Sequence, residues 1–136
     1  MIHGGRCHCA AIGYDFSTEL APSAWPIRAC QCSFCRAHAA LSTSDPRGSL
    51  VFHAHEPDQL ERYRFGLRTA DFLLCRRCGV YIGAQIDSER GSFGIVNTRA
   101  LTSALELVAT PMTYEGEDIL QRTQRRESRW TPIWHG

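Results

Sequence analysis

The distribution of the cysteines is the sequence feature that most limits what this chain can fold into. Seven cysteines occur in 136 residues, in three short motifs: "CHC" at residues 7–9, "CQCSFC" at 30–35 and "CRRC" at 75–78. An odd number of thiols cannot pair completely, and a chain of this length can bury a core without disulfides. Clustered thiols in a reducing compartment favour metal binding or catalysis. The fold therefore has to place three groups of thiols where they can bind a metal or take part in catalysis.

The N-terminal sequence and the apolar segments bear on location. "MIHGGRCHCA" lacks the basic start, the hydrophobic stretch and the small-residue cleavage site of a signal peptide. No uninterrupted apolar segment approaches the length of a membrane span. We therefore expect a soluble, cytoplasmic protein without a membrane partner.

The basic residues exclude some chemistry, because all 15 are arginine and lysine is absent. Without lysine there can be no internal Schiff base to an aldehyde and no lysine-anchored pyridoxal phosphate. The formal net charge is only +1, which gives little support to nonspecific nucleic-acid binding. The arginines of "RTQRRESR", near the C-terminus, are spaced as on a helix, and we interpret them as its solvated face.

Short apolar segments between turn signals predict a mainly β fold, with strands expected at residues 11–16, 49–53, 59–65, 71–75, 80–86, 93–97 and 105–109. The segment 59–65 has no cleanly apolar face, which favours a sheet edge. Two short helices are expected, one over 33–41 with Ser33 as its N-cap and one over 116–127. No repeat, linker or low-complexity tract occurs, so residues 1–136 are expected to form a single domain.

Zinc is the first candidate for the thiols, because structural zinc sites typically take four soft ligands. "CRRCG" is a strong half-site, since two cysteines three residues apart can point at one ion across a turn that glycine permits. Cys7 and Cys9 form a weaker half-site that needs a turn, which Gly4 and Gly5 could permit. The two motifs together supply four thiolates and would tie the N-terminus to the later strands.

The remaining three cysteines, Cys30, Cys32 and Cys35, match a zinc with an open position. Three protein ligands plus water or substrate is the arrangement expected of a catalytic zinc, and a substrate thiol could enter as the fourth ligand. A histidine could fill that position instead and make a second structural site. His38 is the obvious candidate, with His8 and His55 behind it. The sequence leaves both readings open.

The motifs GRCHC (5–9), CQCSFCR (30–36) and CRRCG (75–79) resemble, in this order, the glutathione-dependent formaldehyde-activating enzyme family, which includes the centromere protein V domain. The resemblance covers about residues 3–115 and leaves 116–136 as a C-terminal helical and extended segment. It implies an Mss4-like complex β fold with two zinc ions per chain. The first would be structural, held by Cys7, Cys9, Cys75 and Cys78. The second would be held by Cys30, Cys32 and Cys35.

The resemblance also implies a carbon–sulfur lyase that joins glutathione and formaldehyde into S-hydroxymethylglutathione, so the expected partners are a small thiol and its aldehyde adduct. Glutathione carries two carboxylates, and Arg28 and Arg36, beside the middle motif, are candidate contacts for them. Many family members have a glycine where this chain has "RAHAAL" and His38. The alternative is a noncatalytic zinc module that carries glutathione or meets a protein or nucleic acid.

Overall fold

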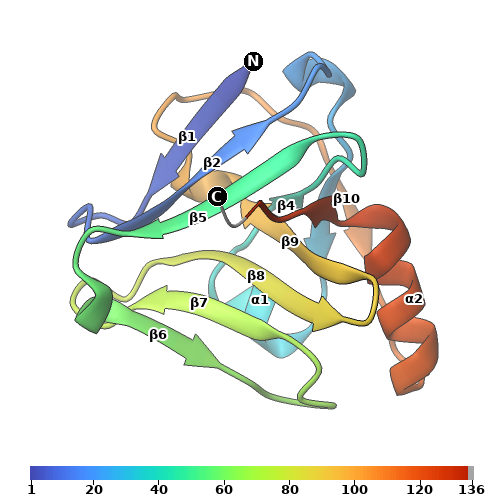
Figure 1. The fold of residues 1–136 in the computed structure, drawn as a ribbon. Coiled ribbons are helices and arrows are strands. Elements are labelled where there is room, and N and C mark those ends of the chain that lie inside the picture. The colour runs from blue at the N-terminus through green and yellow to red at the C-terminus, as the bar shows by residue number, and fades with distance from the viewer. Residues whose placement is uncertain (135–136) are drawn as a thin grey trace.

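Two β-sheets form the framework of the fold (Figure 1), and the predicted mainly β class is confirmed. The structure is a computed structural model and describes residues 1–134. Within that range the smaller sheet has the order β1-β2-β5, with all pairs antiparallel. Its strands are β1 (Ile2–Arg6), β2 (Ile12–Ser17) and β5 (Ser49–Ala54).

The larger sheet has the order β10-β3-β4-β9-β8-β7-β6, and β11 also pairs with β9. An antiparallel meander forms one part of it: β6 (Leu60–Tyr63), β7 (Asp71–Cys75), β8 (Tyr81–Ser88) and β9 (Gly91–Asn97). The other part contains β4 (Ser42–Thr43), β3 (Ile27–Cys30), β10 (Ala109–Met112), which runs parallel to β3, and β11 (Thr131–Pro132). β6 ends the sheet, so the predicted edge position of this segment is confirmed.

Neighbouring residues of a strand point to opposite faces of its sheet, and both faces of the larger sheet carry buried residues. In β7, Leu73 packs with Tyr14 and other residues of the smaller sheet, and so forms the core between the sheets. Phe72, the preceding residue, packs on the other face in a second core with Cys35 and Trp130. The large sheet thus separates two cores, and each of them contains a different group of cysteines.

Two helices occur in the described part of the chain, α1 (Ser33–Ala37) and α2 (Ile119–Arg129). The N-cap of α1 is Cys32, so the expectation of Ser33 was wrong by one residue: the Sγ of Cys32 accepts a hydrogen bond from the backbone N–H of Cys35 at 3.4 Å. α2 begins after Asp118, which forms a reciprocal capping box with Gln121. Short 3₁₀ turns occur at Pro22–Ala24, Pro57–Gln59 and Thr98–Ala100.

Several strands differ from the prediction. The segment 105–109 was expected to be a strand, but β10 begins only at Ala109. β1, β3, β4 and β11 were not predicted, because they are short or contain residues such as glycine that disfavour strands. No helix in residues 1–134 is both long and apolar enough to cross a membrane.

Candidate metal centres and the adjoining cavity

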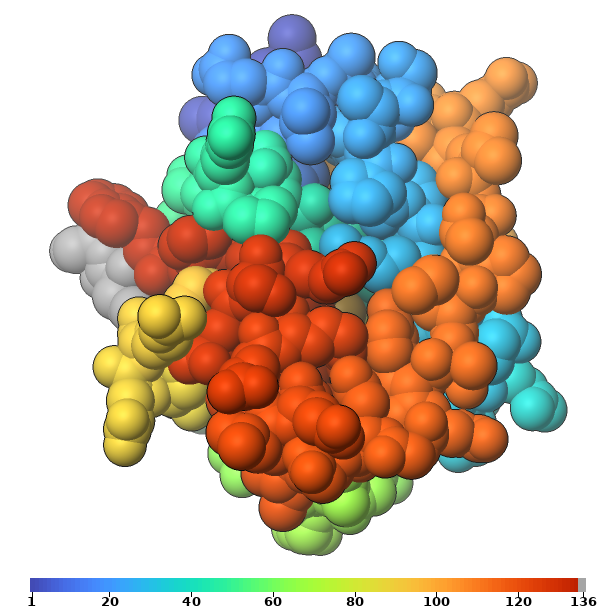
Figure 2. All heavy atoms as spheres, turned by 90° about the vertical axis from the view of Figure 1, so that its right-hand side faces the viewer, coloured from blue at the N-terminus to red at the C-terminus, as the bar shows by residue number. Residues whose placement is uncertain are grey.

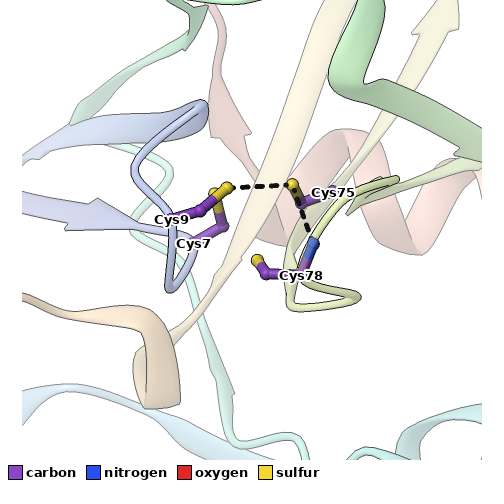
Figure 3. Close-up of side chains that lie close together, drawn as sticks. All are labelled: Cys7, Cys9, Cys75 and Cys78. Atoms are coloured by element: carbon purple, nitrogen blue, oxygen red, sulfur yellow. Dashed lines mark hydrogen bonds between the residues drawn. The ribbon is translucent and has the colours of Figure 1, made fainter.

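The first and third motifs meet at one point of the fold (Figure 3). The Sγ atoms of Cys7, Cys9, Cys75 and Cys78 all lie within 4.8 Å of one another. Those of Cys7 and Cys9 are 3.8 Å apart, and those of Cys9 and Cys75 are 3.5 Å apart. Sulfurs at the corners of a tetrahedron around zinc, at about 2.3 Å from the metal, are about 3.8 Å apart. This donor set therefore fits one zinc ion.

Two turns bring these thiols together. Gly4 and Gly5 lie inside β1, so the expectation that they permit the first turn was wrong. The turn follows β1, and Ala10 takes the left-handed conformation in it, with φ 65°. In the other turn Gly79 has φ 78° and its N–H donates to the carbonyl of Cys75 at 2.8 Å, as expected for a glycine at this place.

Backbone N–H groups donate hydrogen bonds to sulfurs of this group. The N–H of Ile12 lies 3.4 Å from the Sγ of Cys7, and that of Cys78 lies 3.5 Å from the Sγ of Cys75. The N–H of Ala11 lowers the pKa of the Cys9 thiol. Such hydrogen bonds orient the sulfurs for a shared metal ion, while burial raises the pKa of the Cys75 thiol to about 11.

The middle motif forms a separate group on the other face of the large sheet. The Sγ atoms of Cys30, Cys32 and Cys35 lie within 4.8 Å of one another. Cys30 ends β3, Cys32 caps α1 and Cys35 lies in its first turn, so a strand-to-helix junction holds all three. Cys35 is buried, whereas the other two are half-buried.

Interactions among the three thiols of this group shift their pKa values in opposite directions. Contacts with the thiols of Cys30 and Cys35 lower the pKa of Cys32 to about 2. Hydrogen bonding with Cys32 is the main cause that raises the pKa of Cys30, whereas the pKa of Cys35 is raised first by Cys30 and then by Cys32. Three soft sulfur ligands that lie this close together can bind one ion, so this group too fits a metal such as zinc.

His38 does not belong to this thiol group. It is the C-cap of α1, its ring lies 4.5 Å from that of Phe34, and it borders a different hollow, beside β6 and β7. Among the described residues, neither His8 nor His55 has a ring nitrogen in either cysteine group. Within residues 1–134 the structure therefore brings three thiols together without a histidine.

A cavity of about 520 Å³ opens beside the three thiols. This volume is in the range of small-molecule sites. All three cysteines line it, together with residues from β3, α1, the larger sheet, the segment before α2 and α2 itself. Figure 2 shows the face on which α2 lies against that preceding segment. The arginines that line the cavity are Arg28, Arg36, Arg122, Arg125 and Arg126, and Glu115 is the acidic residue found with them.

Both arginines singled out from the sequence therefore border the cavity. Arg28 is half-buried, and its Nη2 donates to the Oγ of Ser44 at 2.9 Å. Burial lowers its pKa. Arg36, in α1, is exposed. Either guanidinium can contact an anionic group of a molecule in the cavity.

The arginines of α2 are the site residues that sequence reasoning missed. Their interpretation as a solvated face was wrong for all but Arg129, which is exposed. Glu117 pairs with Arg122 at 3.2 Å and with Arg125 at 2.8 Å, and Arg126 is buried. Their spacing of three or four residues predicts the helix, but it does not show which face of the helix is covered.

Tyr81 is a buried neighbour of the three-thiol group. Its ring packs edge-on against that of Phe34, at 5.0 Å between centroids, and within residues 1–134 its hydroxyl has no hydrogen-bond partner. Burial, followed by the charges of Cys35, Cys32 and Cys30, raises the pKa of Tyr81 well above its usual value. The hydroxyl therefore stays protonated.

The fold and site together define a β-rich, cysteine-rich domain with two thiol groups that can each hold a metal ion. The model of one family, the glutathione-dependent formaldehyde-activating enzymes, matches residues 2–115, and the chain belongs to this family. The β-rich architecture agrees with the Mss4-like fold that the motifs implied.

Among solved structures, the chain is similar to a Rhodobacter sphaeroides protein, a structural genomics target with a crystal structure. The two are 31% identical, the alignment covers 79% of this chain and 99% of that one, and the TM-score is 0.58. A search of curated proteins gave no match.

Proposed function

We propose that this protein is a zinc-dependent carbon–sulfur lyase that reversibly joins a small thiol, such as glutathione, to an aldehyde, such as formaldehyde, in the cytoplasm. One observation carries the proposal: three clustered thiols, with no histidine among them in the described structure, line a cavity large enough for a small molecule. A metal held by these thiols has room for a further ligand from the cavity.

The proposal gives the two cysteine groups different roles. Cys7, Cys9, Cys75 and Cys78 would close a structural zinc site, because four thiolates complete a tetrahedron. Cys30, Cys32 and Cys35 would hold a second zinc at the cavity wall. Zinc bound there would lower the pKa of a substrate thiol, so that the thiolate is present at neutral pH. His38, which lies outside the group, has no ligand role in this proposal.

The chemistry forms one bond between the substrate sulfur and the carbonyl carbon of the aldehyde. The thiol loses its proton, the sulfur lone pair attacks the carbon, and the carbonyl π electrons move to the oxygen, which takes up one proton to give the hydroxymethyl thioether. The residues of this chain orient the reactants. Arg28 and Arg36 line the cavity where they can contact carboxylates of the thiol. We also propose that the chain forms a single domain over residues 1–136, so that the C-terminal segment 116–136 belongs to the same unit as the thiol groups.

The test is the rate at which ¹³C-formaldehyde exchanges with its glutathione adduct, measured by NMR with and without the zinc-loaded protein. We expect the wild type to accelerate exchange in proportion to its concentration, and Cys32→Ser to lose the acceleration while keeping its fold. Glutathione binding without acceleration would instead select a carrier. Neither binding nor acceleration would select a noncatalytic module.

A further inference from the structure

Arg126 is a buried cation in the cavity wall that forms no ion pair within residues 1–134. The residue is 7% exposed, and its Nη1 donates to the Oγ1 of Thr69 at 2.8 Å. Its Nε has no hydrogen-bond partner in the described structure, and no carboxylate of residues 1–134 forms an ion pair with it. A buried, unsatisfied donor on a charged group is unfavourable in the free protein, which indicates a role in binding.

The neighbouring arginines do not have this property. Arg122 and Arg125 share Glu117, so a carboxylate compensates their charge in part. Burial, followed by the charges of Arg125 and Arg122, lowers the pKa of Arg126 to about 10. The guanidinium nevertheless remains protonated at neutral pH. The cavity therefore presents a fixed positive charge that a bound anion would neutralise.

The side chain of Arg126 is held in place before any ligand arrives. Its guanidinium lies over the ring of Trp130, 4.9 Å from the centroid, and Trp130 is 4% exposed. The hydroxyl of Thr69, in the connection between β6 and β7, holds one end of the guanidinium. A donor fixed in this way loses little conformational entropy on binding.

We propose that Arg126 is an anion-binding residue that makes this chain select thiols carrying an oxyanion, such as a carboxylate, a phosphate or a sulfonate. The inference rests on the proposed function, which places the sulfur of the ligand beside the three thiols. The three thiols and Arg126 line the same cavity, so one molecule can reach both. α2 lies beyond residues 2–115, the part of the chain that the family model matches. The selectivity is thus a property of the C-terminal helix of this chain.

The test measures ligand binding by calorimetry with the zinc-loaded protein. S-methylglutathione keeps both carboxylates but has no thiol, and glutathione diethyl ester keeps the thiol but has no carboxylate. We expect Arg126→Gln to weaken binding of S-methylglutathione about tenfold or more, the effect of one charge-assisted hydrogen bond. Binding of the ester should change less than twofold. Arg126→Lys should recover part of the loss, since it keeps the charge.

Arg129→Gln is the matched control, because Arg129 lies on the same helix but is exposed and does not line the cavity. It should bind S-methylglutathione like the wild type. Thermal unfolding without ligand should show Arg126→Gln to be as stable as the wild type or more so, since the change removes a buried unpaired charge.

Equal binding of S-methylglutathione to the wild type and Arg126→Gln, or no binding to the wild type, would overturn the anion site. That result does not depend on whether the protein accelerates adduct exchange. Conversely, binding that depends on Arg126 without accelerated exchange would overturn the lyase and leave the anion site in place. Glycerol phosphate and methanesulfonate, added as competitors, would show which oxyanion the site prefers.

Discussion

Loss of the four-thiol site should destabilise the whole fold, because this site joins distant parts of the chain. The sulfurs of Cys9 and Cys75 lie 3.5 Å apart although 66 residues separate them in sequence. By the loop-closure relation for a cross-link, a loop of this length stabilises the folded state by about 4 kcal/mol. Domains of this size are stable by about 5–15 kcal/mol. We therefore expect Cys75→Ser, at a site that is 2% exposed, to remove a large part of the stability.

Cys32→Ser is the matched control. Cys30, Cys32 and Cys35 lie within six consecutive residues, and the same relation gives about 2 kcal/mol for a loop that short. Serine is moreover a preferred N-cap, so the change retains the cap that Cys32 provides to α1. This variant should lose the second metal and the reaction with a smaller loss of stability.

The assay combines zinc analysis with urea unfolding of both variants. We expect about two zinc per chain in the wild type and about one in each variant, with the unfolding midpoint of Cys75→Ser far below that of Cys32→Ser. Equal destabilisation by the two changes would refute the division into a structural site and a reactive site.

Two further predictions concern stability away from the metals. Gly5→Ala should lower the free energy of unfolding by about 1–3 kcal/mol, because a Cβ at Gly5 would overlap the ring of Tyr14. Gly4→Ala is the control: its Cβ would meet its nearest atom at 3.8 Å, so its free energy of unfolding should stay within about 0.5 kcal/mol of the wild type. Urea unfolding of both variants separates tight packing at Gly5 from a general intolerance of alanine in β1. The hydrogen bond with Arg125 is the main cause that lowers the pKa of Glu117 in the folded protein. The ionised Glu117 carboxylate therefore stabilises the fold at pH values above its ordinary pKa of 4.5, and this stabilisation is lost as the pH falls through the lower folded pKa. Glu117→Gln should therefore be less stable than the wild type at pH 7, and the difference should shrink in acid; a difference that is constant with pH would contradict the ion pair.

The partition of the cysteines could be predicted from the sequence because ligand motifs are local. The knuckle "CRRCG" needs only a four-residue turn with a glycine behind it, and Gly79 provides that turn. The strand-to-helix junction that gathers Cys30, Cys32 and Cys35 is equally short. The spacing of cysteines within a short motif is sufficient to predict that their sulfurs lie together, because the chain between them is only a few residues long.

The cavity wall could not be predicted in the same way, because it depends on tertiary packing. The periodicity of α2 predicts the helix, but a polar sequence does not show that Arg126 is buried, with its guanidinium over Trp130 and bonded to Thr69. β4 has only two residues and exists through pairing with β3 and β9, which distant segments supply. His38 shows the reverse: its position three residues after Cys35 made it a candidate ligand, whereas its ring packs on Phe34.

The most direct test of the proposed function is a crystal structure of the zinc-loaded protein with glutathione bound. We predict a zinc ion held by Cys30, Cys32 and Cys35, with the glutathione sulfur as its fourth ligand and the rest of the molecule in the cavity. A nitrogen of His38 on that zinc, or glutathione bound away from it, would contradict the proposed function.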